Sequence, residues 1–316
     1  MNEYARCISG AELVTNRLDS PGKLTFSCIE SREIAIPEGS LVRLTVDHVN
    51  MFQGYVFSGE RSREGETSYV AYDQLRYLKA NASYIFENMT LGQIITQIAS
   101  DFGLRTGRLA DTGYAFPCLI KENESCLDII FDALTETIIQ TGKIYLFFDD
   151  AGALTLMEAE KLILTTVIGE QSLATDYTYK REIDTDTYNR IKLVQKNAES
   201  GRTDVYVHED TDTIRKWGLL QYYDEVNENL NAAQIDEMCK NYLAYYNRVL
   251  QTLTLEAIGL PMIRAGTILP VRIAAIQGGT LRLLLTEKVT HSIKDGVHTM
   301  RIEVKNFEHL GGIAVV

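Results

Sequence analysis

The sequence has few cysteines, and their spacing suits neither a zinc site nor a disulfide framework. The 316 residues include five of them, Cys7, Cys28, Cys118, Cys126 and Cys239. The number is odd and no two form a Cys-x-x-Cys pair, so neither kind of site is expected. We expect buried free thiols, which proteins keep reduced in the cytoplasm.

Long hydrophobic runs and a secretory signal are also missing. No apolar run approaches the ~18 residues that cross a bilayer. The N-terminal stretch MNEYARCISGAELVTN has no basic start followed by an apolar core. We therefore expect no membrane partner, and we expect synthesis in the bacterial cytoplasm. A role outside the cell would require lysis or release within a larger particle.

Basic residues are too few and too scattered for a protein that wraps nucleic acid. There are 31 Lys and Arg against 43 Asp and Glu, a formal net charge of −12. Phosphate binding needs clustered Lys and Arg, and no such cluster occurs. An acidic surface would let DNA pass without sticking, although plain solubility is the simpler explanation of the charge.

The sequence contains no established catalytic motif. It has no GxSxG, HExxH, GxxxxGK[ST] or GxGxxG. Acidic pairs such as Asp149/Asp150 and Asp184/Asp186 lie in expected turns, where Asp is favoured because it bonds its own backbone. A glycosidase pair in a cleft is the less favoured interpretation. We expect no catalytic residue, no metal and no cofactor, and hence no enzyme.

Two histidines flank one expected turn. His291 and His298 stand on either side of SIKDGV and would lie close together across a hairpin. Zinc sites use such residues, but four ligands are the rule. Only Glu287 and Glu303 are near in sequence, so a structural pair is favoured over a metal site.

The pattern of strands and helices indicates an α+β protein with three parts. Residues 1–83 contain short alternating strands separated by turn signals, typical of an antiparallel β-barrel or sandwich. Residues 84–160 change to a helical period in TLGQIITQIASDFG and NESCLDIIFDALTETIIQTG, which predicts a small inserted α/β domain. Residues 161–316 return to strands, with one amphipathic helix, and predict a second barrel or sandwich.

The two β-rich parts contain a similar segment. Each has an Ile, two residues, a Gly, a hydroxyl residue and then strand-forming hydrophobes, with Gly39 in one copy and Gly266 in the other. A glycine at the start of a strand permits a positive φ or a tight entry. The chain therefore either contains two copies of one β module or shows a pattern that any two β units can share.

The stretch AYDQLRYLKA predicts a short helix between the first β part and the insertion. Its apolar stripe consists of Tyr72, Leu75 and Leu78, flanked by Tyr77. We expect the stripe to pack on the open side of the first β unit. The polar side chains, expected to meet solvent or a neighbouring chain, are Asp73, Arg76 and Lys79.

The single tryptophan lies in an aromatic segment of the third part. Trp217 and Gly218 belong to RKWGLLQYYDEV, which has two further tyrosines but few basic residues between the aromatics. Such a cluster suits packing or a protein interface better than stacked bases.

Several unrelated strings resemble the YqbQ/XkdQ group of tail proteins from phage-like particles of the PBSX type. The longest begins MFQGYVFSGERSREGETSYVAYDQLRYLKA, and TDTYNRIKLVQKN, WGLLQYYDEVNENLN, RAGTILPV and HSIKDGVHTMRIEV follow in order, covering about residues 20 to 305. From these strings and the repeat we take the following candidate structural and assembly residues: Gly39, Gly54, Tyr72, Asp73, Leu75, Tyr77, Leu78, Trp217, Gly218, Gly266, His291 and His298.

The resemblance implies a baseplate hub related to the late-control D proteins of contractile tails. Such hubs form a homotrimeric ring of tube-protein-like barrels that joins the hexameric tail tube to the trimeric central spike. Tape-measure and other baseplate proteins are the further partners, and DNA would be only passing cargo. The particle would be a phage or a phage-tail-like bacteriocin. Three chains with two β modules each would present six similar units and adapt sixfold to threefold symmetry.

A second resemblance concerns the insertion. YIFENMTLGQIITQIASDFGL is similar to the opening of a LysM glycan-binding module, but nothing after Leu104 predicts a closing strand. The alternative function is therefore a peptidoglycan-binding, LysM-like tail module.

Overall fold

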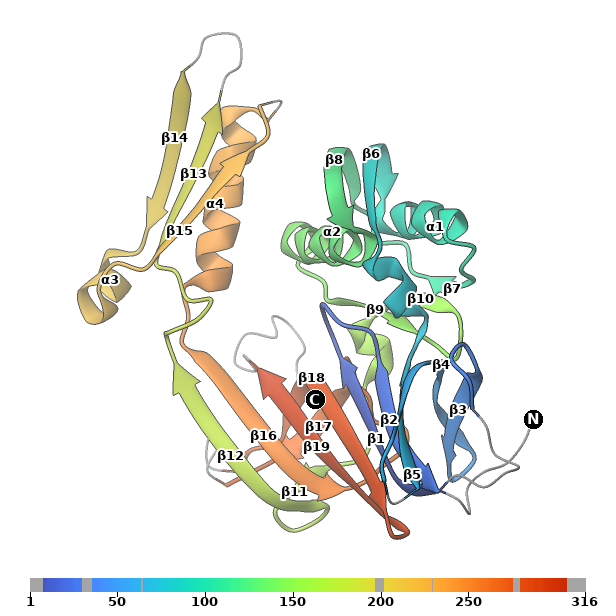
Figure 1. Cartoon of the computed structure of the whole chain (residues 1–316). Coiled ribbons are helices and arrows are strands. Elements are labelled where there is room, and N and C mark those ends of the chain that lie inside the picture. The colour runs from blue at the N-terminus through green and yellow to red at the C-terminus, as the bar shows by residue number, and fades with distance from the viewer. Residues whose placement is uncertain are drawn as a thin grey trace. The chain divides into compact units, whose positions relative to one another are not determined.

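The computed structural model describes residues 8–29, 36–63, 65–196, 202–228, 230–274 and 279–305. The chain forms two compact units, one of Met1–Thr178 with Leu253–Val316 and one of Tyr179–Thr252 (Figure 1). Strands β12 (Ala174–Glu182) and β16 (Leu250–Ile258) contain the two points where the chain passes between them. The structure is mostly β, with several antiparallel sheets, which fits the coarse fold class expected from the sequence.

The largest sheet contains the strands at both ends of the chain. Its continuous order is β12-β16-β19-β18-β1-β2-β5-β4-β3, and β17 pairs with β18 and β11 off this path. The N-terminal strands are β1 (Ile8–Asn16), β2 (Lys23–Ile29), β3 (Leu41–Val46), β4 (Val49–Arg61) and β5 (Glu66–Tyr72). The C-terminal strands are β11 (Ile168–Gly169), β17 (Ile268–Arg272), β18 (Arg282–Lys294) and β19 (Val297–Lys305).

The strand order repeats within this sheet. β1 to β5 are arranged 1-2-5-4-3, and β12, β16, β17, β18 and β19 follow the same order when numbered along the chain. The two sets join where β1 pairs antiparallel with β18, with Gly10 opposite Lys294 and Asn16 opposite Lys288. We call these two sets the N-terminal and C-terminal strand sets.

This join groups the chain differently from the ranges 1–83, 84–160 and 161–316. Backbone hydrogen bonds between β1 and β18 place the first and last ranges in one sheet. The separate compact unit is instead Tyr179–Thr252, which lies inside the third range. The division into three modules at residues 1–83, 84–160 and 161–316 stays a prediction. The two compact units are set instead by pairing between strands far apart in the sequence.

An α/β part follows β5 in the first unit. Its elements are η1 (Gln74–Lys79), β6 (Asn81–Thr90), α1 (Leu91–Asp101), β7 (Thr106–Leu109), β8 (Ala115–Ser125), α2 (Cys126–Thr141), β9 (Tyr145–Asp149), β10 (Leu154–Glu158) and η2 (Ala159–Leu162). The apolar faces of α1 and α2 share one core with Leu75 and Leu78 of η1. Both segments for which a helical period was predicted form helices: Thr90 and Gln93 make a capping box at the start of α1, and Gly142 ends α2 at φ 67°.

Strand β8 was missed by sequence reasoning. It pairs antiparallel with β6, where no strand was expected after Leu104. Much of β8 is exposed, so it lacks the regular apolar alternation of a half-buried strand.

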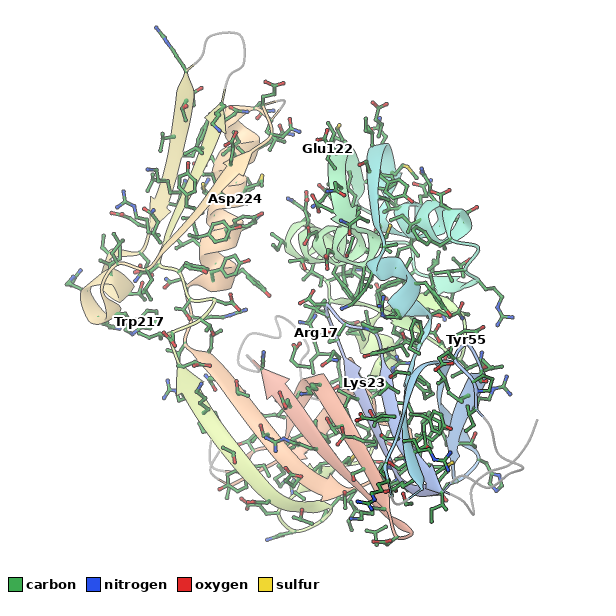
Figure 2. All side chains as sticks on the ribbon, viewed as in Figure 1. Arg17, Lys23, Tyr55, Glu122, Trp217 and Asp224 are labelled. Carbon is green, nitrogen blue, oxygen red and sulfur yellow. The ribbon has the colours of Figure 1, made fainter. Side chains whose placement is uncertain are left out.

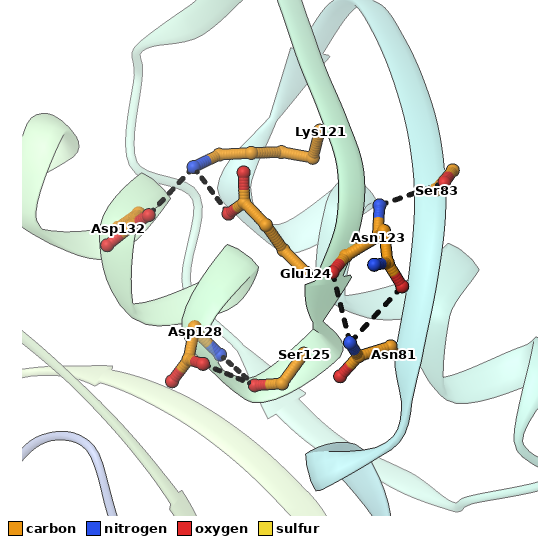
Figure 3. Close-up of polar contacts among 8 residues, drawn as sticks. All are labelled: Asn81, Ser83, Lys121, Asn123, Glu124, Ser125, Asp128 and Asp132. Carbon is orange, nitrogen blue, oxygen red and sulfur yellow. Dashed lines mark hydrogen bonds and ion pairs between the residues drawn. The ribbon is translucent and has the colours of Figure 1, made fainter.

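A polar network fixes the β6–β8 pair to the start of α2 (Figure 3). The Lys121 ammonium lies 2.9 Å from Glu124 and 2.7 Å from Asp132 of α2. The Asn81 side chain donates to the Asn123 carbonyl at 3.0 Å. These contacts replace apolar packing on the exposed side of this pair.

The second unit is a three-stranded sheet with a helix on one face (Figure 1). The sheet order is β14-β13-β15, and α4 contacts β13 and β14. The elements are β13 (Arg190–Lys196), β14 (Thr203–Glu209), α3 (Thr211–Trp217), β15 (Gln221–Val226) and α4 (Ala232–Tyr246). The amphipathic helix expected in the third range is α4, which Asn231 caps, and β13 pairs antiparallel with β14. In the described part of the chain, no helix is long and apolar enough to span a membrane.

Candidate functional site

The two repeat glycines share a backbone conformation. Gly39 has φ 80° and Gly266 has φ 91°, and each precedes the third strand of its set. Their surroundings differ, however. Nothing lies within 4 Å of a Cβ built on Gly39, whereas a Cβ on Gly266 would lie 2.9 Å from a methyl of Leu146 on β9. Gly266 therefore also allows the loop before β17 to pack against the α/β part.

This difference predicts unequal effects of alanine at the two glycines. Gly39→Ala should lower the free energy of unfolding by about 1–2 kcal/mol, the cost of a positive φ for an L side chain. Gly266→Ala should cost a further ~1–3 kcal/mol, because the added methyl overlaps Leu146. Urea unfolding of both variants measures the difference. Equal losses would mean that Leu146 moves away without cost.

Asp73 is buried, contrary to the expectation that it meets solvent. Its side chain is 6% exposed. One carboxylate oxygen accepts from the Gly22 amide at 2.7 Å and the other from the Leu75 amide at 3.1 Å. Asp73 thereby caps η1 and ties the β1–β2 turn to it. Burial and, to a lesser extent, the nearby Asp149 carboxylate raise the pKa of Asp73 to about 8.

The apolar stripe of η1 faces a different core from the one expected. Leu75 and Leu78 pack into the core of the α/β part rather than onto the first β unit. The reason is that α2 and β9, which follow later in the chain, pack against η1. The sequence period shows that a face is buried but not which core receives it.

An aromatic surface lies beside η1. The centre of the Phe57 ring lies 5.5 Å from the centre of the Tyr72 ring and 5.8 Å from that of Tyr77. The Tyr77 ring also contacts the ring of Tyr55. Arg76 lies over the Phe57 ring at 5.4 Å, so it contacts aromatic side chains rather than only solvent. Lys79 is exposed as expected.

Gly54 explains how the strand beneath this surface comes close to its neighbour. A Cβ on Gly54 would lie 2.2 Å from the backbone oxygen of Tyr72. β4 therefore approaches the end of β5 more closely than any other residue type would allow.

Asp73 lines a small cavity with two charged groups from distant parts of the chain. Asp149 comes from the end of β9, Arg264 from the loop before β17, and Asp150 lies at the rim. The cavity volume is about 30 Å³, room for one or two water molecules and too little for a sugar or nucleotide. We call Asp73, Asp149 and Arg264 the junction triad, because one member comes from each of the three sequence ranges.

The triad is held mostly by backbone contacts. Asp149 accepts from the Gly152 amide at 2.7 Å, and burial raises its pKa. Arg264 donates to the Asp149 carbonyl at 3.2 Å and its guanidinium lies 4.0 Å from the centre of the Phe148 ring. Burial lowers the pKa of Arg264. One Asp149 oxygen and the Arg264 Nε have no hydrogen-bond partner among the described residues.

The histidine pair lies where the hairpin was expected. His291 Nδ1 is 2.9 Å from His298 Nε2, and His291 Nε2 is 2.7 Å from the Ile263 carbonyl. Nε2 of His291 must therefore donate, and Nδ1 accepts from His298. Burial lowers the pKa of His291 to about 4, so the pair is neutral at pH 7. The two nearby glutamates, Glu287 and Glu303, instead form ion pairs with Arg17 and Lys288.

Metal-ligand clusters and disulfides are absent from the described residues. No group of three His, Cys, Asp or Glu side chains in the described ranges is arranged to hold a metal ion. None of the described cysteines forms a disulfide: Cys28, Cys126 and Cys239 are buried, while Cys118 is exposed, contrary to expectation. Cys7 lies outside the described residues.

Trp217 and Gly218 end α3 in the second unit (Figure 2). Gly218 has φ 82°, and its carbonyl accepts from the fully buried Asn189 side chain at 2.8 Å. Trp217 is half-buried. It stands apart from the tyrosine cluster of this unit, in which Tyr222 and Tyr246 stack at 5.4 Å.

Sequence reasoning missed the junction triad. Arg264 was within the quoted RAGTILPV string, and Asp149 was read only as a turn residue. A clue was available for Arg264, since an Arg directly before an Ala-Gly strand entry has no obvious role in the turn itself. Nothing local indicated that it meets Asp73.

The large sheet ends in two open edges. β3 and β12 are its last strands in the described structure. On β4, the edge that faces β3 is covered as far as Val56, whose amide donates to Ser40 at 3.0 Å. Beyond Val56 no described strand lies on that edge, so residues 57–60 have no pairing strand there among the described residues. Open edges of this kind are sites for pairing with another chain.

Comparison with known proteins supports the tail-protein resemblance. The model of the YQBQ-like family matches residues 11–305. The uncharacterized protein YqbQ of Bacillus subtilis is 32% identical over 295 residues, covering 91% of this chain and 89% of that protein. The phage-like element PBSX protein XkdQ of the same organism is 32% identical over 277 residues, covering 85% and 82%.

Solved structures share the fold at low identity. A 43 kDa tail protein of prophage MuSo2 from Shewanella oneidensis has TM-score 0.70 at 15% identity, with 94% of each chain covered. A tail protein from Neisseria meningitidis has TM-score 0.71 at 13% identity, covering 95% of this chain and 92% of that one. With its family model matched over residues 11–305 and a phage-like element protein 32% identical to it, the chain belongs to the YQBQ-like family.

Proposed function

We propose that the protein is the baseplate hub of a contractile phage tail or phage-tail-like particle. Three copies would form a ring between the hexameric tail tube and the trimeric central spike, next to tape-measure and other baseplate proteins. The observation that carries the proposal is the repeated strand order within one sheet that still has two open edges.

The internal join of the two strand sets supplies a pattern for contact between copies. On β18, one edge pairs first with β17 at residues 282–285 and then with β1 at residues 288–294. On β4, the corresponding edge pairs with β3, and its continuation, residues 57–60, is open. The two pairings have the same register. Leu41, the first residue of β3, lies opposite Tyr55 of β4, and Ile268, the first residue of β17, lies opposite Leu285 of β18.

The strand that corresponds to β1 in the C-terminal set is β12, and its outer edge is open. β12 of one copy would therefore pair with residues 57–60 of the next, repeating the contact between β1 and β18. A ring built this way alternates N-terminal and C-terminal sets. Three copies give six similar sets, which matches a sixfold tube on one side and a threefold spike on the other.

Two further solved structures have a similar fold. The E. coli c3393 protein, a type VI secretion component described as similar to the phage T4 tail proteins gp27 and gp5, has TM-score 0.56 with 98% of this chain covered. A chain of a PdpA–VgrG complex has TM-score 0.54, and the match spans 60% of that chain. These likenesses support the fold on which the proposal rests.

The test is the mass of the protein in solution together with imaging of its parent particle. We expect a ring of three beneath the tail tube, with the two strand sets alternating around it. A particle in which the two sets do not superpose, or in which the chain lies outside the tube axis, would contradict the proposal.

The second candidate function is peptidoglycan binding by the LysM-like α/β part. Ile85 and Ile120 lie directly opposite each other on β6 and β8 and are 65% and 47% exposed. An exposed apolar pair of this kind marks a candidate contact surface. Sedimentation with purified peptidoglycan tests this function, and retention in the pellet that is lost in Ile85→Ser would favour it.

A further inference from the structure

The junction triad has an imbalance of charge that the described contacts do not resolve. Two carboxyl groups, Asp73 and Asp149, face one guanidinium, Arg264, in a cavity closed to bulk water on most sides. Asp150 is the only other charged residue that lines the described cavity, and it is exposed at the rim. If both inner carboxyls were ionised, the interior would hold one uncompensated negative charge, which is costly to bury.

The hydrogen bonds of Asp149 indicate where the extra negative charge is neutralised. Asp149 is 6% exposed. The backbone amides of Gly152 and Gln74 both face its carboxyl group, yet its Oδ2 atom has no hydrogen-bond partner of normal geometry among the described residues. A buried carboxylate oxygen is normally hydrogen-bonded, so this oxygen can accept a hydrogen bond from a further donor. Arg264 does not supply it, because its guanidinium contacts the Asp149 backbone carbonyl and the Phe148 ring instead.

A bound metal ion is the less suitable occupant. Both oxygens of Asp73 already accept backbone amides, from Gly22 and Leu75. No set of three metal-ligating side chains is found among the described residues. The guanidinium of Arg264 also repels a cation from the same cavity.

We propose that Asp73 and Asp149 together bind one proton at the junction, which balances the charge of the triad at neutral pH and links the attachment of the α/β part to pH. This inference is independent of the proposed hub function. With the proton on Asp73, the two remaining charges that line the inner cavity, the Asp149 carboxylate and the Arg264 guanidinium, sum to zero. The raised pKa values of both carboxyls agree with this arrangement.

Loss of the proton has a defined structural consequence. The three segments that meet here are the β1–β2 turn with Gly22, the β9–β10 turn with Gly152 and the loop that contains Arg264. Above about pH 8 the triad becomes net negative, and separation of these segments would relieve the repulsion. Because folding raises the pKa of Asp73, the junction is most stable below the ordinary carboxyl pKa of about 4, and this stability is lost progressively as the pH rises to about 8.

Infrared difference spectroscopy of the full chain, with only the aspartate carboxyls isotope-labelled, tests the proposal. We expect a label-sensitive band of an undissociated carboxylic acid at pH 7, with loss of the band at a midpoint near pH 8. The band should be absent in Asp73→Asn. Its midpoint should fall by about one pH unit or more in Asp149→Asn, where the like charge is removed.

Asp19→Asn is the matched control, because burial also raises the pKa of this aspartate but it lies outside the triad. The control should leave the band and its midpoint unchanged. Absence of the band from the unmodified protein at pH 7 would overturn the proposal, as would its loss in Asp19→Asn alone. If Asp73→Asn does not fold, the Asp149→Asn midpoint decides, and an unchanged midpoint contradicts a shared proton.

Discussion

Replacing Leu75 with aspartate is expected to prevent folding of the first compact unit. Leu75 is 4% exposed and packs with the apolar faces of α1 and α2. An aspartate there would lose the buried apolar contact and place a carboxylate without a partner two residues from Asp73. The combined cost should be about 4 kcal/mol or more, which is a large fraction of the stability of a typical domain.

Soluble yield and chemical denaturation of Leu75→Asp measure this effect. Lys79→Asp is the matched control, because it introduces the same side chain at an exposed position of η1. The control should fold with a change in unfolding free energy within ~0.5 kcal/mol. A Leu75→Asp protein as stable as the control would show that η1 is not packed as described.

Thr178→Pro should abolish ring formation without unfolding the chain, if copies pair through β12. The carbonyl of Leu173 accepts from Ile258 of β16, and backbone groups alternate in direction along a strand. The Thr178 amide therefore points to the open edge. Proline removes that donor, and its ring obstructs an incoming strand, while edge positions tolerate proline within the chain itself.

Each interface should weaken by at least about 1.4 kcal/mol, or tenfold in dissociation constant. A ring needs all of its interfaces, so the loss of assembly should be larger. Native mass spectrometry and the fraction of particles with a complete baseplate measure it. Thr178→Ala keeps the amide and should assemble normally. Intact rings of Thr178→Pro with a normal circular dichroism spectrum would exclude β12 as the contact strand, and the hub function would then need another interface.

Local features of the structure could be predicted because their causes are local. The Thr90 cap, the glycine end of α2 at Gly142 and the positive φ of Gly39 and Gly266 depend on a few neighbouring residues. The hairpin that brings His291 to His298 follows from a short turn between two strands. In each case side-chain chemistry and backbone geometry act within one element.

Features that needed the tertiary structure join distant segments. β1 and β18 pair through backbone hydrogen bonds, which nearly any sequence can make. No pattern of residues therefore predicted that the two strands belong to one sheet. β8 was missed because an exposed two-stranded pair needs no apolar alternation. The burial of Leu75 was visible in its period, but its partners in α2 come later in the chain.

The amino-acid sequence alone indicated the family, an α+β class rich in antiparallel strands, the helix ends and the glycine conformations. The tertiary structure alone decided that Asp73, Asp149 and Arg264 share one cavity and that the two strand sets share one sheet. The physical reason is that burial and backbone pairing are properties of the assembled chain. A carboxylate such as Asp73 looks like a surface residue until the groups that remove its water are in place.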